Sequence, residues 1–176
     1  MKNRIIAKLF CLTSLFILPL ASCVRLPENI QPVQHFELAH YLGKWYEIAR
    51  LDHSFERGLS KVSAEYSLRG DGGITVTNRG FSAQKQEWQE ATGKAYFVDK
   101  TNEGFLKVSF FGPFYGAYII FELDNYYQYA FISGPNKDYL WLLSRTPSVP
   151  PAIKEKFLQL ASEKGFDVSK LIFPAQ

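Results

Sequence analysis

The chain is poor in cysteine. It has two among 176 residues, Cys11 and Cys23, and both lie near the N-terminus. The rest of the chain has no thiol, which excludes a disulfide framework, a thiolate metal site and a cysteine nucleophile there. Such a domain must be stabilised by its hydrophobic core. The composition can supply one, because 47% of the residues are hydrophobic and 16% are aromatic.

The chain also has little net charge beyond its first residues. It contains 20 Lys and Arg against 17 Asp and Glu, a formal charge of +3. Lys2, Arg4 and Lys8 account for this excess, and residues 1–22 contain no acidic side chain. The remainder is formally neutral and has no cluster of Lys and Arg. The charge pattern therefore argues against a nucleic-acid partner.

Motifs for catalysis and metal binding are equally scarce. His35, His40 and His53 fall in expected tether or loop regions, without metal-ligand spacing or a nucleophile motif. Glu47 and Glu65 could be inward-facing carboxylates, but isolated glutamates are usually solvated or paired. We therefore expect no catalytic residue, no metal and no cofactor, and an enzyme stays the less favoured alternative.

The N-terminus has the pattern of a secretory signal. Three basic residues precede a mostly apolar stretch over residues 9–20, which is too short to span a membrane. The segment that follows, Leu20-Ala21-Ser22-Cys23, resembles the bacterial lipobox, in which the cysteine becomes the lipid-modified first residue. We expect that residues 1–22 are removed, and that Cys23 carries N-palmitoyl and S-diacylglycerol groups.

The residues after Cys23 bear on where the chain is anchored. Val24 stands where an aspartate would favour the inner membrane, so the resemblance to proteobacterial lipoproteins implies the outer membrane, on its periplasmic face. Residues 23–35 include two prolines and no hydrophobic periodicity. This predicts a lipidated, extended tether that spans at most about 3.3 Å per residue. A single globular domain is expected over residues 36–176.

Short strands with close turns dominate that domain. Val62, Ala64 and Tyr66 alternate with polar residues, as in a half-buried strand. Three later segments are apolar on both faces and need cover on each side, namely residues 118–121, 129–132 and 139–143. Residues 151–164 predict a helix that provides this cover. About eight strands of this kind indicate an up-and-down barrel or a sandwich.

Three motifs in this chain resemble those of the lipocalin family, in the family's order. Gly43-Lys44-Trp45 is similar to the first motif, and Asp124 with Tyr127 is similar to the second. Arg145, just after the penultimate strand, is similar to the third. The likeness to bacterial lipoprotein lipocalins covers nearly everything from residue 36 onward.

The resemblance implies an all-β fold: an eight-stranded antiparallel up-and-down barrel with one C-terminal α-helix packed on its outside. It implies a lipid ligand, a fatty acid or a lysophospholipid, and a role in lipid storage, transport or outer-membrane maintenance. It also allows a homodimer. Burial of an acyl chain in an apolar cavity is worth about 0.8 kcal/mol per CH₂ and requires no catalytic group.

The resemblance also implies roles for single residues. The motif residues are expected to close one end of the barrel, with the Arg145 guanidinium against the Trp45 indole in a contact worth roughly 0.5–2 kcal/mol. Asp124 is expected to be a turn residue. Aromatic residues near the expected cavity walls are candidates for ligand contact: Phe110, Tyr115 and Trp141. Ordinary packing is an equal alternative for each, because the inward face of a strand depends on its register.

Three other interpretations stay open: a lipocalin-fold enzyme that acts on a lipid, a transmembrane β-barrel, and a purely structural lipoprotein with a filled interior. A transmembrane barrel needs a lipid-facing apolar alternation on every strand. The polar face of residues 61–68 and the predicted helix over 151–164 count against that interpretation.

Overall fold

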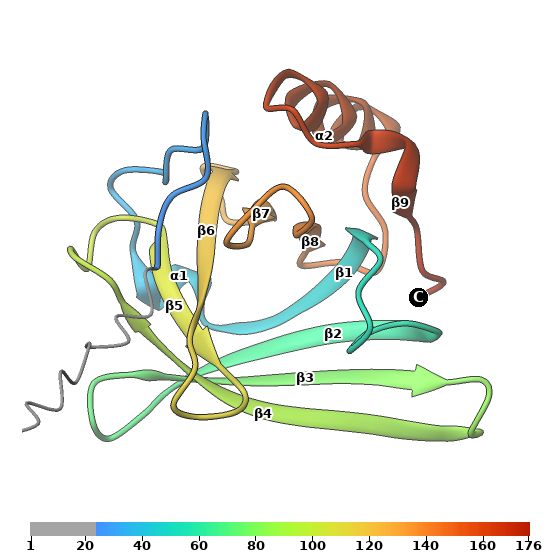
Figure 1. The fold of residues 1–176 in the computed structure, drawn as a ribbon, viewed down its shortest axis with the longest axis horizontal. Helices are drawn as coiled ribbons and strands as arrows, with labels where there is room; N and C mark the ends of the chain where they lie inside the picture. Colours follow the sequence, from blue (N-terminus) through green and yellow to red (C-terminus); the bar gives the residue numbers. More distant parts are fainter. Residues whose placement is uncertain (1–23) are drawn as a thin grey trace, which may run out of the picture.

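Eight antiparallel strands form the body of the computed structural model, which describes residues 24–176 (Figure 1). The strands are β1 (Gly43–Leu51), β2 (Leu59–Leu68), β3 (Ile74–Ser82), β4 (Glu87–Phe97), β5 (Phe105–Ser109), β6 (Gly116–Leu123), β7 (Tyr129–Ser133) and β8 (Leu140–Ser144). Each pairs with the next along the chain, and β1 also pairs with β8, which closes the ring. The predicted barrel is confirmed. The expected signal peptide over residues 1–22 and the expected lipid attachment at Cys23 lie outside the described residues.

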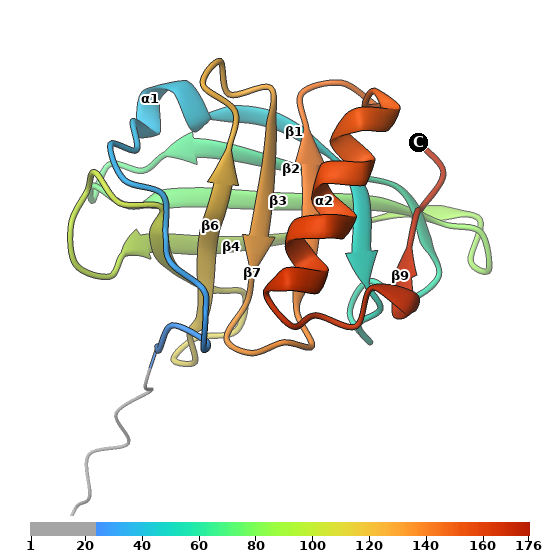
Figure 2. The same cartoon turned by 90° about the horizontal axis from the view of Figure 1, so that it is seen from above.

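One long helix, α2 (Pro151–Glu163), packs on the outside of the barrel against the late strands, as predicted (Figure 2). The Phe157 side chain is fully buried, and its ring centroid lies 5.0 Å from that of Phe131 on β7. The Lys156 Nζ contacts Glu122 of β6 at 2.5 Å. Within residues 24–176, no helix is long and apolar enough to cross a membrane.

Short elements complete the barrel at both ends of the domain. A single turn, α1 (Leu38–Tyr41), leads into β1. After α2, the 3₁₀ turn η1 (Val168–Lys170) leads into β9 (Leu171–Ile172), which pairs with the C-terminal end of β1. The chain then runs into the gap where β1 and β2 diverge, and the side-chain amide of Gln176 donates to the carbonyl oxygens of Glu47 and Val62.

The late strands are apolar on both faces because each face meets a separate core. Phe131 of β7 belongs to the outer core beneath α2, whereas its neighbours Ala130 and Ile132 belong to the core inside the barrel. Successive side chains of a strand point to opposite faces, which divides the residues between these two cores. The cover that the sequence required is therefore α2 on one side and the barrel interior on the other.

Residues 24–35 differ from the free tether expected from the sequence. Ile30 is fully buried in the outer core. The Val33 N–H donates to the Ile120 carbonyl of β6 at 2.9 Å, and the Val33 carbonyl accepts from the Gly104 N–H at 2.9 Å. The segment packs along the outside of the barrel (Figure 2). The sequence of this segment shows no hydrophobic periodicity because the segment is neither a helix nor a strand, and single side chains make its contacts.

The two ends of the barrel carry different connections. Because the strands alternate in direction, the β1–β2, β3–β4, β5–β6 and β7–β8 loops gather at one end, here called the open end. The helix α1 and the β2–β3, β4–β5 and β6–β7 loops lie at the other end, here called the closed end. Because the paired strands close the wall of the barrel, a ligand could reach the interior only through one of these two ends.

Truncation of the buried helix side chain should destabilise the whole domain. We expect Phe157→Ala to lower the free energy of unfolding by about 3–5 kcal/mol, because it removes a buried ring and leaves a cavity. Urea unfolding followed by circular dichroism measures this change. Glu155→Ala, on the exposed face of the same helix, is the control and should change the stability by less than about 0.5 kcal/mol. Equal effects of the two substitutions would contradict the packing described here.

Candidate functional site

Arg145, directly after β8, holds the closed end together. Its guanidinium carbon lies 4.0 Å from the centroid of the Trp45 ring, a cation–π contact. The same guanidinium donates to the carbonyl oxygens of His40 at 2.6 Å, Lys44 at 2.9 Å and Tyr127 at 3.3 Å. One side chain therefore joins α1, β1 and the β6–β7 loop.

The other closure residues lie around this contact. Trp45 is fully buried and its indole N–H donates to the Tyr41 carbonyl at 2.8 Å. Gly43 has a φ of 89°, in the left-handed region that favours glycine. The Asp124 carboxylate accepts from the backbone N–H groups of Tyr126 and Gln128, which is the hydrogen bonding of a turn residue.

Inside the barrel, three tyrosine hydroxyls form a buried chain. The Tyr118 hydroxyl lies 2.7 Å from those of both Tyr41 and Tyr66. Burial raises the pKa of all three phenols, that of Tyr66 to about 12, so they stay neutral near physiological pH. The apolar side chains around them come from seven strands, including Trp45, Ile74, Val76, Ala95, Leu106, Ile120, Ile132 and Leu143.

The structure places Phe110 and Trp141 with the interior core. Gly93 of β4 makes room for the Phe110 ring, since an added Cβ there would lie 2.8 Å from it. The Trp141 indole N–H donates to a carboxylate oxygen of Glu56 at 3.0 Å. Both aromatics therefore face the barrel interior, and their contact with a ligand stays a prediction.

Tyr115 is placed elsewhere, which corrects its assignment to the cavity wall. The Nζ atoms of Lys107 and Lys94 lie 5.4 Å and 5.9 Å from the centroid of its ring. These lysines face outward, because Ala95 and Val108, their neighbours on β4 and β5, form the inward-facing pair. The expectation failed because no register is readable in the loop that precedes β6.

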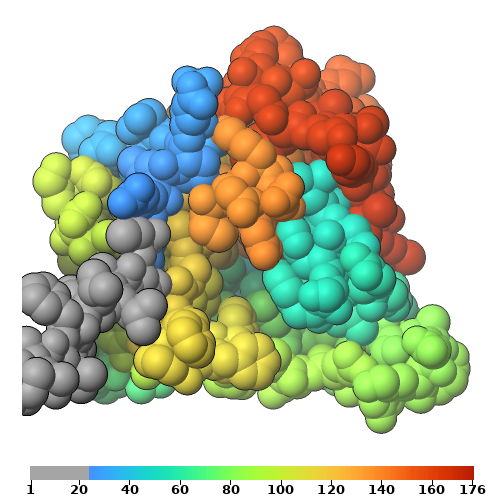
Figure 3. Space-filling view, in the orientation of Figure 1, coloured from blue at the N-terminus to red at the C-terminus, as the bar shows by residue number. Residues whose placement is uncertain are grey.

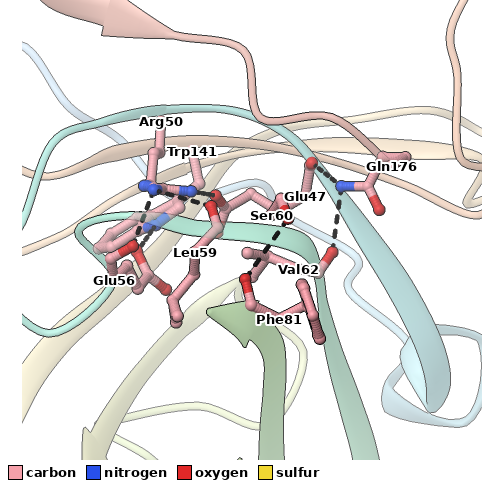
Figure 4. Close-up of polar contacts among 9 residues, drawn as sticks. All are labelled: Glu47, Arg50, Glu56, Leu59, Ser60, Val62, Phe81, Trp141 and Gln176. Atoms are coloured by element: carbon pink, nitrogen blue, oxygen red, sulfur yellow. Dashed lines mark hydrogen bonds and ion pairs between the residues drawn. The ribbon is translucent and has the colours of Figure 1, made fainter. Parts of the chain in front are cut away.

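A buried ion pair, which sequence reasoning missed, lies toward the open end (Figure 4). Arg50 is 1% exposed, and its Nη1 donates to Glu47 at 2.5 Å. Its Nη2 donates to the backbone carbonyl of Glu56 at 2.8 Å. The indole of Trp141 is hydrogen-bonded to the Glu56 carboxylate. We call these four residues the Arg50 cluster: Glu47, Arg50, Glu56 and Trp141.

A β-bulge explains why two residues three positions apart share the inner face. The register between β1 and β8 shifts between Glu47 and Ala49. Glu47 stays opposite Leu143 and Arg50 opposite Trp141, and both partners belong to the interior core. A regular strand would point Glu47 and Arg50 to opposite faces. Glu65, by contrast, is exposed.

The Arg50 cluster holds two carboxyl groups for one guanidinium. Burial, together with the nearby charge of Glu56, raises the pKa of Glu47 from 4.5 to about 8, against the opposing effect of Arg50. Burial also raises the pKa of Glu56. We infer that one of the two carboxyls keeps its proton near neutral pH, so that the cluster has no net charge. The Arg50 Nε is buried without a hydrogen-bond partner among the described residues.

The open end is hollowed above this cluster. Figure 3 looks onto it and shows a depression between the β1–β2 loop (teal), the β5–β6 loop (yellow) and the β7–β8 loop (orange). His53 of the β1–β2 loop stacks on the Tyr139 ring with centroids 4.2 Å apart. No group of His, Cys, Asp and Glu within residues 24–176 is arranged to hold a metal ion.

The fold and motif geometry define a class of protein. The model of the lipocalin-like domain family matches residues 36–176, and the chain belongs to the lipocalin family. Among solved structures, insecticyanin from the tobacco hornworm Manduca sexta is similar in fold, with a TM-score of 0.68 at 23% identity, covering 86% of each chain.

Sequence relatives narrow this class. A Vibrio cholerae protein named "Outer membrane lipoprotein Blc" is 62% identical over 158 residues, which are 89% of this chain and 92% of that protein. Its Escherichia coli K12 namesake is 47% identical over 173 residues, 98% of each chain. The chain is a lipocalin of the Blc type, a lipid-anchored protein of the outer membrane. Mouse apolipoprotein D is a more distant relative, 30% identical over 148 residues, which are 80% of this chain and 77% of that protein.

Loss of the Arg145 fork should weaken the closed end. We expect Arg145→Lys to lower the free energy of unfolding by about 1–3 kcal/mol, because one ammonium cannot serve three carbonyls and the indole face together. Arg79→Lys is the control, since the Arg79 guanidinium carbon lies 4.3 Å from the ring centroid of the half-exposed Trp88 on the outer surface. Its effect should stay below about 0.5 kcal/mol. Chemical unfolding distinguishes the two, and an equal loss in both would refute the special role of Arg145.

The buried carboxyl of Glu47 should make stability depend on pH. Its pKa is higher in the folded chain than its ordinary value, so the folded state binds more protons between the two values. The stability that it contributes is present below the unfolded pKa and is lost as pH rises through about 8. The free energy of unfolding should therefore fall between acidic and alkaline pH. We expect Glu47→Gln to make this fall smaller by at least about 1.4 kcal/mol, the equivalent of one pKa unit.

Urea unfolding at about pH 5 and about pH 9 tests this expectation. The exposed Glu65 provides the control, since Glu65→Gln should keep the pH dependence of the unsubstituted protein. The explanation fails if Glu47→Gln keeps it as well.

Proposed function

We propose that the barrel holds a fatty acid or a lysophospholipid, for lipid storage or transport and for maintenance of the outer membrane at its periplasmic face. The observation that carries this proposal is the gradient of polarity along the barrel interior. Apart from the Arg145 stack and the chain of three tyrosine hydroxyls, the side chains packed with Trp45 toward the closed end are apolar, and the ion pair of the Arg50 cluster lies toward the open end. An amphiphile matches this gradient with its acyl chain inward and its headgroup toward the open end.

The energetics favour a binding role. Each methylene that leaves water for the apolar interior contributes about 0.8 kcal/mol. The neutral state inferred for the Arg50 cluster avoids an uncompensated charge beside the acyl chain. The free donor on the Arg50 Nε suits an oxygen of a carboxylate or ester near the headgroup. Phe110 and Trp141 supply aromatic surface between these two regions.

The anchor belongs to the same proposal. Removal of residues 1–22 would expose Cys23 as the acylated first residue, and Val24 begins the described chain directly after it. The lipid on Cys23 would then keep the barrel at the membrane from which its ligand comes.

A lipocalin-fold enzyme that acts on a lipid is the second candidate. One observation favours it, since buried carboxyls with raised pKa values are frequent at catalytic sites. The Arg50 ion pair gives these carboxyls a structural account, and no residue of the Arg50 cluster is a serine, threonine or cysteine nucleophile. Incubation of the purified protein with lysophosphatidylethanolamine separates the candidates, because release of free fatty acid would indicate catalysis.

Direct binding tests the carrier function. The chain from Val24 to Gln176 should co-purify with lipid detectable by native mass spectrometry. After delipidation, it should bind cis-parinaric acid saturably, with quenching of tryptophan fluorescence by energy transfer. Trp141→Phe should lose a large part of this quenching, because Trp141 faces the interior. Trp88→Phe is the control on the outer face and should lose little. If no lipid co-purifies and the titration shows no saturable binding, the carrier function is ruled out.

A further inference from the structure

The open end carries three large apolar side chains in water. Phe55 of the β1–β2 loop is 58% exposed, and Phe111 and Phe114 of the β5–β6 loop are 81% and 75% exposed. These three are called the open-end phenylalanines. The β1–β2 and β5–β6 loops that carry them border the depression at the open end (Figure 3). Exposed rings gathered around one opening indicate a surface that another apolar phase covers.

Local contacts hold these rings in place. The Phe55 ring is stacked on His53 with centroids 5.2 Å apart, and His53 is stacked in turn on Tyr139. The Phe114 N–H donates to the Phe111 carbonyl at 3.2 Å, a turn that keeps the two phenylalanines close together. The rings are therefore presented outward by structured loops.

The start of the described chain lies at the same end. In Figure 2, the described chain (blue) begins at the level of the open-end loops, along the lower edge of the barrel, and then runs along β6 toward α1. The Phe36 N–H donates to the Asn102 carbonyl of the β4–β5 loop at 2.9 Å, which marks its arrival at the closed end. Ile30 is buried on the way.

This route leaves almost no free chain between the lipid anchor and the barrel. Cys23 immediately precedes Val24, and one residue spans at most about 3.6 Å. An acylated Cys23 therefore puts the membrane surface next to the open end, and away from the closed end. The bilayer to which the chain is anchored is therefore the apolar phase within reach of the open-end phenylalanines.

We propose that the open-end phenylalanines insert into the anchoring bilayer, so that the barrel opens directly onto the lipid surface. Lipid can then pass between bilayer and interior without crossing water. This inference deepens the proposed function and depends on it for the identity of what is exchanged, whereas the orientation of the barrel is independent of it.

Orientation is tested on the acylated mature chain, Cys23 to Gln176, in vesicles of phosphatidylethanolamine and phosphatidylglycerol. Phe111→Cys and Tyr126→Cys each introduce the sole free thiol, one at the open end and one at the closed end, at side chains of similar exposure, 81% and 83%. Each carries a fluorophore, and spin-labelled phospholipid serves as quencher. We expect loss of fluorescence at position 111 and none at 126. Equal quenching at both, or quenching at 126 alone, overturns the proposal.

Exchange is tested with the triple variant Phe55→Ser, Phe111→Ser, Phe114→Ser and with Tyr126→Ser as its matched control. Transfer of a fluorescent fatty acid from the same vesicles to the barrel should slow at least about tenfold in the triple variant and stay unchanged in the control. Tenfold corresponds to about 1.4 kcal/mol, no more than one phenylalanine ring is worth on burial. An unchanged transfer rate in the triple variant overturns the proposal.

Two further measurements separate the possible failures. Titration with the fatty acid in solution should give the same affinity for the triple variant and the unsubstituted chain. Absence of binding by the unsubstituted chain contradicts the proposed function, and leaves the quenching result as the test of orientation. If a bis-maleimide instead cross-links two copies through the thiol of the unlabelled Phe111→Cys variant in the vesicles, while the fluorophore on the labelled variant escapes the lipid quencher, the phenylalanines cover a second copy, and bilayer insertion is refuted.

Discussion

The stack of Arg145 on Trp45 is the contact on which the arrangement of the barrel depends. A planar guanidinium can present its face to an indole and its edge to carbonyl oxygens at the same time. Arg145 does both, and so joins α1, the start of β1 and the β6–β7 loop. With one end tied in this way, the loops at the other end take no part in the closure, and under the proposal above they carry the residues that contact lipid.

The Arg50 cluster meets a different constraint, since a buried charge is costly unless it is paired. The β1 bulge solves this by turning Glu47 onto the face of Arg50. A second carboxyl, Glu56, arrives from the β1–β2 loop and is held by Trp141. The cluster thus couples the conformation of an open-end loop to the barrel wall. Stability is not its evident benefit. Under the proposed function, its benefit is a neutral polar region within reach of a ligand headgroup.

Sequence patterns predicted what depends on periodicity and on motif order. The double apolar faces of residues 129–132 anticipated both the interior core and the cover by α2, and the resemblance to the lipocalin motifs implied the pairing of Arg145 with Trp45. Patterns failed where placement depends on a single irregularity. The Glu47–Arg50 pair requires a bulge that leaves no local signal, and Tyr115 follows a loop whose register cannot be read. Ile30 stands among polar residues and prolines, so its burial was not visible.

The packing of residues 24–35 decides which end of the barrel meets the membrane. Twelve free residues could extend to about 40 Å, about the size of a small domain, and either end could then face the lipid. Burial of Ile30 and the backbone bonds of Val33 remove that freedom. The first residue of the segment adjoins the anchor, and the segment runs from the open end to the closed end. The open end is therefore the end that lies near the membrane. A tether that seemed to separate the domain from the membrane is instead the element that orients it.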